Sequence, residues 1–253
     1  MGRGSVAATA DGTEEHMAAS RGGGRPPRGQ GPVARAVSFL GELLITAGAV
    51  LGLFVVYSLW WTNVVADRHA DQQADKVRDH WARSDTGPGA LDTKAGIGFL
   101  HVPAMRNGTV LVEKGTSPDV LDEGVAGYYT DPAKAVLPMT GKKGNFTLAA
   151  HRDGHGAKFH NIDKVHEGDP VVFETKDEWY VYKVYSVLPE TSKYNVDVLA
   201  QIPKESGRTK PGHYITLTTC TPVYTSRYRY VVWAELVRTE KVDSKRTPPA
   251  ELR

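Results

Sequence analysis

Cysteine occurs once in this chain of 253 residues, as Cys220, at the end of the β-like run 214–220. Thr221 and Pro222 follow it, and proline ends a strand because it cannot donate to the hydrogen-bond ladder of a sheet. A single thiol cannot form a disulfide within its own chain, so Cys220 is either an inert buried side chain or a reactive one. A thiol becomes a nucleophile when a base takes its proton or a cation stabilises the thiolate. The chemistry open to Cys220 therefore depends on which histidine and which cation lie beside it.

His151 is the histidine best placed to act as that base. It follows the apolar stretch 144–150, which has the composition of a strand, and it opens the glycine-rich segment HRDGHG. Functional side chains commonly lie on loops that a rigid scaffold holds in place. The other histidines lie outside the strand-rich part of the chain or are scattered within it, so His151 is the candidate base.

A zinc site is the competing interpretation of the same stretch, because His151, His155 and His160 are potential ligands. Two histidines four residues apart face one ion only on a helix, and Gly154 and Gly156 disfavour a helix here. The glutamate of the H-E-x-x-H zinc motif is also missing. We therefore expect no metal in this site.

The candidate cations are Arg227 and Arg229, at the start of the β-like run 229–237. If the chain returns antiparallel after Pro222, an early residue of this run lies opposite Cys220. An arginine in that place can bind an oxyanion through forked, charge-assisted hydrogen bonds. The two arginines have the same parity along a strand, so the alternation of side chains does not choose between them.

The elements that must position these groups are short strands. Seven runs are rich in valine, isoleucine, threonine and aromatic residues, and clusters of glycine, proline, asparagine and aspartate separate them. They are residues 96–103, 109–115, 144–151, 169–175, 178–188, 214–220 and 229–237. Residues 117–125 and 156–166 are expected to form short helices or helical turns. The pattern predicts one all-β domain over residues 95–240, either a closed barrel or a sandwich.

The stretch before this domain predicts a membrane anchor. Residues 37–62 are almost entirely apolar, and about 20 such residues span the hydrocarbon core of a bilayer. A cleaved signal peptide is the alternative, but the apolar run is longer than a typical one and no clear cleavage site follows. Four arginines within residues 21–35 precede the run, whereas the charges after it are mixed, so the positive-inside rule predicts a cytoplasmic N-terminus and an extracellular domain.

The remaining segments are expected to be tails and a linker, without catalytic residues. Residues 1–36 and 241–253 have the composition of disordered tails, and residues 63–94 have that of a polar, helix-favouring stalk or linker. The 31 lysines and arginines nearly balance the 29 aspartates and glutamates, and the net charge of +2 gives no reason to expect a nucleic-acid partner.

Two motifs together give the exported domain a family resemblance. The segment TLTTCTP, with an arginine nine residues after the cysteine, resembles the TLxTC…R signature of the sortases. These are cysteine transpeptidases of Gram-positive cell envelopes. The segment from Asn145 to Thr175 is similar to the family's A-G-H-R stretch and the residues after it, with Ala150 in place of the usual glycine. The resemblance covers about residues 95–238, and its details are most like class E, the housekeeping sortases of actinobacteria.

The resemblance implies an eight-stranded β-barrel and a catalytic triad of His151, Cys220 and Arg229, since the family spacing selects Arg229 over Arg227. It also implies a membrane-anchored enzyme that needs no cofactor. The enzyme would cleave the C-terminal sorting signal of secreted proteins, L-A-x-T-G or L-P-x-T-G, between threonine and glycine. It would then join the threonine to an amine of a peptidoglycan precursor or cross-bridge.

Tyr128 and Tyr129 are candidate substrate-binding residues, because an aromatic ring could fill the space that a proline ring leaves when alanine replaces it. Two alternatives remain open from the sequence. The same residues could make a thiol peptidase that hydrolyses the bond without transfer, and the domain could be an inactive extracellular binding module.

Overall fold

The computed structural model describes residues 31–83 and 96–253, and the chain divides into two compact units, Met1–Val50 and Leu51–Arg253. Most of the first unit's described part belongs to helix α1, Pro32–Val56, which extends into the second unit. The predicted tail of residues 1–36 lies mainly outside the described residues, although α1 already begins at Pro32.

Helix α1 is long and apolar enough to cross a membrane. Its 25 residues would extend about 37 Å at the rise of an α-helix, compared with about 30 Å for the hydrocarbon core. None of its side chains is buried against protein, and leucine, valine and phenylalanine side chains are exposed along it. The predicted span of residues 37–62 thus lies within α1, the π-helical turn η1 (Tyr57–Trp61) and the first residue of the next helix, α2 (Thr62–Arg83).

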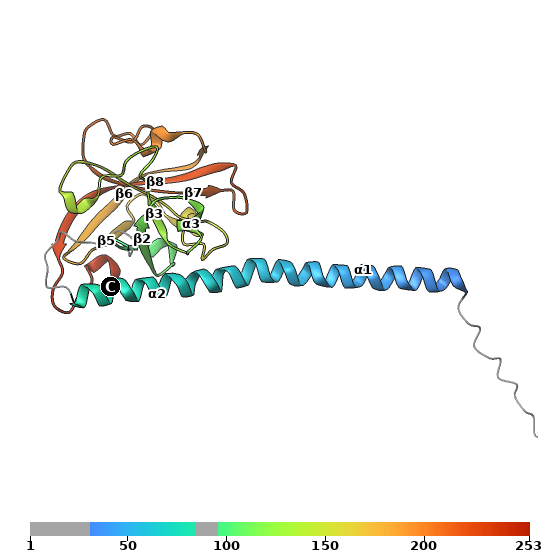
Figure 1. The fold of residues 1–253 in the computed structure, drawn as a ribbon. Helices are drawn as coiled ribbons and strands as arrows, with labels where there is room; N and C mark the ends of the chain where they lie inside the picture. Colours follow the sequence, from blue (N-terminus) through green and yellow to red (C-terminus); the bar gives the residue numbers. More distant parts are fainter. Residues whose placement is uncertain (1–30, 84–95) are drawn as a thin grey trace, which may run out of the picture. The chain divides into compact units, whose positions relative to one another are not determined.

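Eight strands close into a barrel in the order β1-β2-β3-β4-β7-β8-β6-β5. The predicted barrel is confirmed, and Figure 1 shows β6, β7 and β8 side by side across the domain. The pairs β2–β3 and β4–β7 are parallel and the others are antiparallel. The strands are β1 (Gly98–His101), β2 (Thr109–Lys114), β3 (Ala126–Tyr128), β4 (Gly144–Ala149), β5 (Pro170–Glu174), β6 (Glu178–Ser192), β7 (His213–Thr221) and β8 (Tyr228–Lys241).

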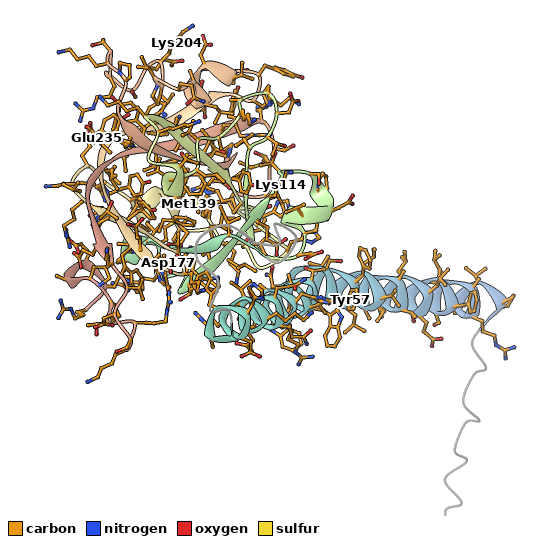
Figure 2. All side chains as sticks on the ribbon, turned by 60° about the vertical axis from the view of Figure 1, so that its left-hand side comes forward. Tyr57, Lys114, Met139, Asp177, Lys204 and Glu235 are labelled. Atoms are coloured by element: carbon orange, nitrogen blue, oxygen red, sulfur yellow. The ribbon has the colours of Figure 1, made fainter. Side chains whose placement is uncertain are left out.

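Short helical turns occupy several of the connections. They are η2 (Pro103–Met105), α3 (Pro118–Leu121), η3 (Pro138–Thr140), η4 (Ile162–Lys164), η5 (Val196–Leu199) and η6 (Ala250–Leu252). The expected turns at 117–125 and 156–166 correspond to α3 and η4. Charged side chains such as Asp177 and Lys204 lie at the outer surface of the domain (Figure 2).

The barrel interior is filled by alternate residues of the strands. On β4, Phe146 and Leu148 are buried in the main apolar cluster, as are Ile215 and Leu217 on the parallel neighbour β7. The Phe146 ring lies 4.9 Å from that of Phe173 on β5. Successive side chains of a strand point to opposite faces. The residues that alternate with these core residues therefore point to the outside of the barrel, where they can form hydrogen bonds with loops.

The polar outward face of β4 and β7 holds the long connection between β6 and β7. Asn145 donates to the carbonyl of Ala200 at 2.9 Å and accepts a bond from Thr216 at 2.8 Å. The indole of Trp233 on β8 donates to the carbonyl of Val198 at 3.0 Å. These bonds fix η5 against the outside of the barrel.

The predicted stalk is not free of the domain. Helix α2, Thr62–Arg83, buries Ala66, Ala70, Val77 and Trp81, which recur at the spacing of one helical face. That face packs on Phe99, Leu111 and Val125 of the barrel wall. The mostly polar composition of the helix gives no sign of this narrow apolar stripe, which makes α2 part of the barrel domain. Residues 84–95 of the predicted linker lie outside the described residues.

The predicted C-terminal tail of residues 241–253 is also packed on the domain. Arg246 donates to the Glu174 carboxylate at 2.6 Å, and Arg238 forms a two-pronged pair with Glu251. Val242 and Leu252 pack on an apolar cluster on the outside of β5 and β6. The charge and the two prolines of this segment predict disorder, but paired charges and two apolar contacts hold it against the domain.

Candidate active site

Cys220 and Arg229 face each other across two neighbouring strands. In the antiparallel pairing of β7 and β8, Cys220 stands directly opposite Arg229. Arg229 is half-buried, whereas Arg227 precedes β8, is exposed and lies over the Tyr228 ring. The register therefore distinguishes the two arginines that parity alone leaves equivalent.

His151 reaches the same place through the parallel pairing of β4 and β7. The last pair of that ladder is Ala149 with Thr218, and His151 and Cys220 each lie two residues further along. The connection is continued by Thr219, whose hydroxyl donates to the carbonyl of Ala150 at 2.6 Å. Parallel strands that end together thus place the histidine and the cysteine at one edge of the barrel.

A cavity of about 380 Å³ lies at this edge, and His151, Cys220 and Arg229 all line it. Its walls are partly apolar, with Leu121, Val196 and Leu199 among them. The thiol is half-buried, so a substrate could reach it, and Cys220 forms no disulfide. The candidate nucleophile, base and cation are each predicted from a different sequence pattern, and all three lie around one cavity.

Arg229 presents its guanidinium from the start of β8. Its Nη1 donates to the carbonyls of Ser226 at 3.2 Å and Tyr228 at 3.0 Å. Both bonds use one nitrogen, so within the described residues the Nη2 edge is available to an incoming oxygen atom. A forked donor with a fixed first nitrogen suits the developing charge of a carbonyl oxygen.

His151 is held by a carboxylate. Its Nε2 lies 2.7 Å from Oδ1 of Asp122, which follows α3. The His155 ring lies 5.2 Å from the His151 ring, and its Nδ1 is 3.7 Å from the same oxygen. The sequence predicts a turn at 117–125 but offers no signal that Asp122 meets His151, because the contact joins residues 29 positions apart.

The three histidines of the zinc interpretation do not converge. His160 turns its Nδ1 to the backbone carbonyl of Arg152 at 2.8 Å, away from the pair formed by His151 and His155. Within residues 31–83 and 96–253, no group of three or more His, Cys, Asp or Glu side chains has the geometry to hold a metal ion.

The two candidate substrate-binding tyrosines have different surroundings. Tyr129 lines the cavity, and its hydroxyl lies 3.1 Å from that of Thr218. Burial raises the pKa of the Tyr129 phenol, although the Thr218 hydrogen bond and the Arg229 guanidinium oppose the shift. Tyr128 belongs instead to the barrel core, 7% exposed, with its ring 6.5 Å from that of Phe146. Neighbouring strand residues point to opposite faces, so only one of the pair reaches the site.

Arg152 ties the histidine segment to the cysteine strand. It is buried, donates to the hydroxyl of Thr221 at 2.7 Å and pairs with Asp163 at 3.1 Å. No sequence pattern assigns Arg152 a role, because an arginine in a glycine-rich loop is ordinarily expected to be exposed to solvent. Lys193 and Asn195, which follow β6, also line the cavity, and no sequence pattern points to them.

A closed barrel that carries a cysteine opposite an arginine, with a histidine at the same edge, has the parts of a cysteine-dependent acyl-transfer enzyme. The model of the sortase domain family matches residues 100–237. The chain is 72% identical to sortase SrtE2 of Streptomyces coelicolor, over 98% of this chain and all of that one. It is 45% identical to sortase SrtE1 of the same organism, over 89% of this chain and 64% of that one. The chain belongs to the sortase family and is a sortase-type cysteine transpeptidase.

Solved structures agree with this assignment. The crystal structure of sortase E1 from S. coelicolor with a tripeptide in its active site matches with a TM-score of 0.58 and 44% identity, over 64% of this chain and 99% of that one. Sortase E from Streptomyces avermitilis matches with a TM-score of 0.55 and 32% identity, over 65% of this chain and all of that one. The expected resemblance to class E is confirmed by these relatives.

Proposed function

We propose that this transpeptidase cleaves a C-terminal sorting signal of the type L-A-x-T-G or L-P-x-T-G between threonine and glycine. The observation that carries the proposal is the placement of Cys220 opposite Arg229, with His151 beside them around one cavity. A secreted protein would enter the cavity as an extended C-terminal peptide, with its threonine carbonyl next to the thiol.

In the first half of the reaction, the Cys220 sulfur attacks the threonine carbonyl carbon as a thiolate. The carbonyl oxygen takes the negative charge and accepts hydrogen bonds from the Arg229 guanidinium. The tetrahedral species collapses, the carbon–nitrogen bond breaks, and the glycine amine leaves with a proton from the His151 imidazolium. A thioester between Cys220 and the threonine carbonyl remains.

In the second half, an amine attacks the thioester carbon. His151 takes the proton that the amine loses, and the carbon–sulfur bond breaks as a new amide bond forms. The thiolate and the imidazolium are restored. The acceptor that fits an extracellular domain is an amine of a peptidoglycan precursor or cross-bridge. Water in place of the amine would give hydrolysis.

The peptide preference is proposed to depend on Tyr129. Proline fixes the backbone φ near −65° and pre-shapes a substrate, whereas an alanine-containing peptide relies on the pocket for its shape. The Tyr129 ring lines the cavity and is fixed by the Thr218 hydroxyl, so it can occupy the volume that a proline ring would fill. We therefore expect L-A-x-T-G to be used at least as well as L-P-x-T-G.

The enzyme is further proposed to be anchored in the cell membrane by α1, as a single-pass protein with a cytoplasmic N-terminus. The length and composition of α1 and the arginines before it support this arrangement.

Mass spectrometry of the purified chain with both peptides and a glycine-based amine tests the reaction. We expect a thioester adduct on Cys220 and, with the amine present, a product in which the amine replaces the C-terminal glycine. Cleavage that releases only free acid in excess amine would favour a hydrolase. No adduct and no cleavage with either peptide would contradict the proposed sorting-signal chemistry.

A further inference from the structure

The shortest polar contact of His151 is with a residue that the Cys–His–Arg triad does not include. Its Nε2 lies 2.7 Å from Oδ1 of Asp122, within the range of a charge-assisted hydrogen bond. We propose that Asp122 is a positioning residue for catalysis, which fixes the ring of His151 and the nitrogen on which it carries its proton. This inference rests on the proposed role of His151 as the acid and base.

The carboxylate decides where the neutral ring of His151 carries its proton. An ionised carboxylate only accepts hydrogen bonds, so Nε2 of His151 must be the donor and must carry hydrogen in the neutral ring. The other ring nitrogen, Nδ1, is then the one without a proton. It is the nitrogen able to take a proton from the thiol or from an acceptor amine. The contact with Asp122 thus assigns the two nitrogens different tasks.

The position of Asp122 is itself fixed by the chain around it. Its backbone N–H donates to the carbonyl of Pro118 at 2.8 Å, at the end of α3. Leu121, the preceding residue, lines the catalytic cavity. The Asp122 side chain is 41% exposed and that of His151 is 28% exposed, so the pair lies at the rim of the cavity rather than in the core.

The position of His151 is also fixed by its neighbours. The backbone N–H of Phe159 donates to the carbonyl of His151 at 2.9 Å, and the His155 ring lies against the His151 ring. His155 is too far from Asp122 for a normal hydrogen bond, because its Nδ1 is 3.7 Å from Oδ1. Of these two histidines, His151 is therefore the one that the Asp122 carboxylate binds.

This arrangement makes a distinction that mutagenesis can detect. A group that acts through His151 should change the rate of proton transfer and leave the binding of the sorting peptide intact. General acid–base catalysis contributes about 10²–10⁴-fold, and the imidazole itself stays in place when the carboxylate is removed. We therefore expect a smaller loss of kcat, about tenfold to a hundredfold, with KM changed less than about twofold.

The experiment uses the full chain in detergent micelles, with Asp122→Ala, the isosteric Asp122→Asn and the control Asp119→Asn. Asp119 is an exposed carboxylate of α3, the helix that ends just before Asp122. We expect Asp119→Asn to keep wild-type kcat. Thermal unfolding of all three variants identifies any variant that fails to fold. If Asp122→Ala does not fold, the isosteric Asp122→Asn still tests the proposal.

Nuclear magnetic resonance on ¹⁵N-histidine-labelled protein supplies a readout independent of activity. The hydrogen-bonded Nε2–H of His151 should give a downfield signal that the His151→Gln variant lacks and Asp122→Ala loses. In Asp122→Asn the signal should move upfield, because a neutral amide oxygen is a weaker acceptor than a carboxylate. An unshifted signal together with wild-type kcat in the folded Asp122 variants would overturn the proposal while leaving the sortase chemistry intact. If the wild type failed on every sorting peptide, the proposed substrate would be wrong, and the signal would still decide whether Asp122 holds His151.

Discussion

Among the individual residues, the pairing of Cys220 with Arg229 gives the sharpest prediction. An oxyanion donor is typically worth about 10²–10³ in rate, so Arg229→Ala should lower kcat by about that factor, while Cys220→Ala and His151→Ala should abolish turnover. Arg227, two residues away and exposed, is the matched control, and Arg227→Ala should keep a large part of the activity. Steady-state transpeptidation rates check this, and a larger loss at Arg227 would contradict the assignment.

Tyr128 and Tyr129 form a second matched pair of neighbouring residues. Tyr129→Ala should change the ratio of kcat/KM for the L-A-x-T-G and L-P-x-T-G peptides, because its ring lines the cavity. Tyr128→Ala should leave that ratio alone and lower stability by about 3–5 kcal/mol, since its ring lies in the barrel core. Rates on both peptides, with chemical denaturation of each variant, separate the two effects. An unchanged ratio in Tyr129→Ala would remove the residue from substrate selection.

Glu113 on β2 is a buried acid, 8% exposed, on the face of the strand shared with Leu111 and covered by α2. Burial, with the charge of Glu123 added, raises its pKa to about 7. The folded state therefore binds more protons than the unfolded state between about pH 4.5 and pH 7, and stability should fall as pH rises through that window.

Glu113→Gln should remove this loss, so that the variant is more stable than the wild type at pH 8 by about 1–2 kcal/mol, with a smaller difference at pH 5. Urea unfolding at the two pH values measures it. The exposed Glu167→Gln serves as control and should show the wild-type dependence on pH. A wild-type stability that rises from pH 5 to pH 8, with no effect of Glu113→Gln, would refute the assignment.

Among the secondary-structure elements, helix α2 is the one that composition describes least well. Trp81 is 7% exposed and meets Phe99 edge-on at 5.3 Å, so Trp81→Ala should lower the free energy of unfolding by about 3–5 kcal/mol. His69→Ala, an exposed change on the same helix, should shift it by no more than about 0.5 kcal/mol. If α2 were a stalk free of the domain, denaturation experiments would give both variants the same free energy of unfolding.

The same helix also reaches the histidine loop. The Asp67 carboxylate lies 2.7 Å from the Lys158 ammonium, and Asn63 accepts a bond from the backbone of Gly156 at 2.9 Å. The loop that follows His151 is thus tied to residues 91 and 93 positions earlier in the sequence, and such long-range contacts leave no local signal.

The strands show where sequence patterns succeed and where they stop. Each of the seven predicted runs contains a strand. These strands could be predicted because each run is long enough to show enrichment in β-branched or aromatic residues. The three-residue β3 has the sequence AGY, which carries no such signal, although its pairing with β2 and β4 closes the barrel. Cys220 and His151 could be found from local composition. Arg229 needed the family spacing, and Asp122 needed the folded contact.

For the protein as a whole, the orientation across the membrane is open to direct test. The arginines before α1 predict that the N-terminus is cytoplasmic and the catalytic domain outside. A protease added to intact cells stripped of their wall should degrade the barrel and leave an N-terminal tag intact. Permeabilised cells, in which both parts are accessible, are the control. Protection of the barrel in intact cells would reverse the proposed topology.

The single half-buried cysteine makes this protein its own reporter. A maleimide dye or spin label can attach to no other thiol, so the wild-type chain needs no background substitutions before spectroscopy. The extent of labelling would count competent active centres in a preparation, and protection by a bound peptide would give its affinity without any turnover. For an enzyme whose proposed substrates are whole proteins, this permits ligand screening before any of those proteins is in hand.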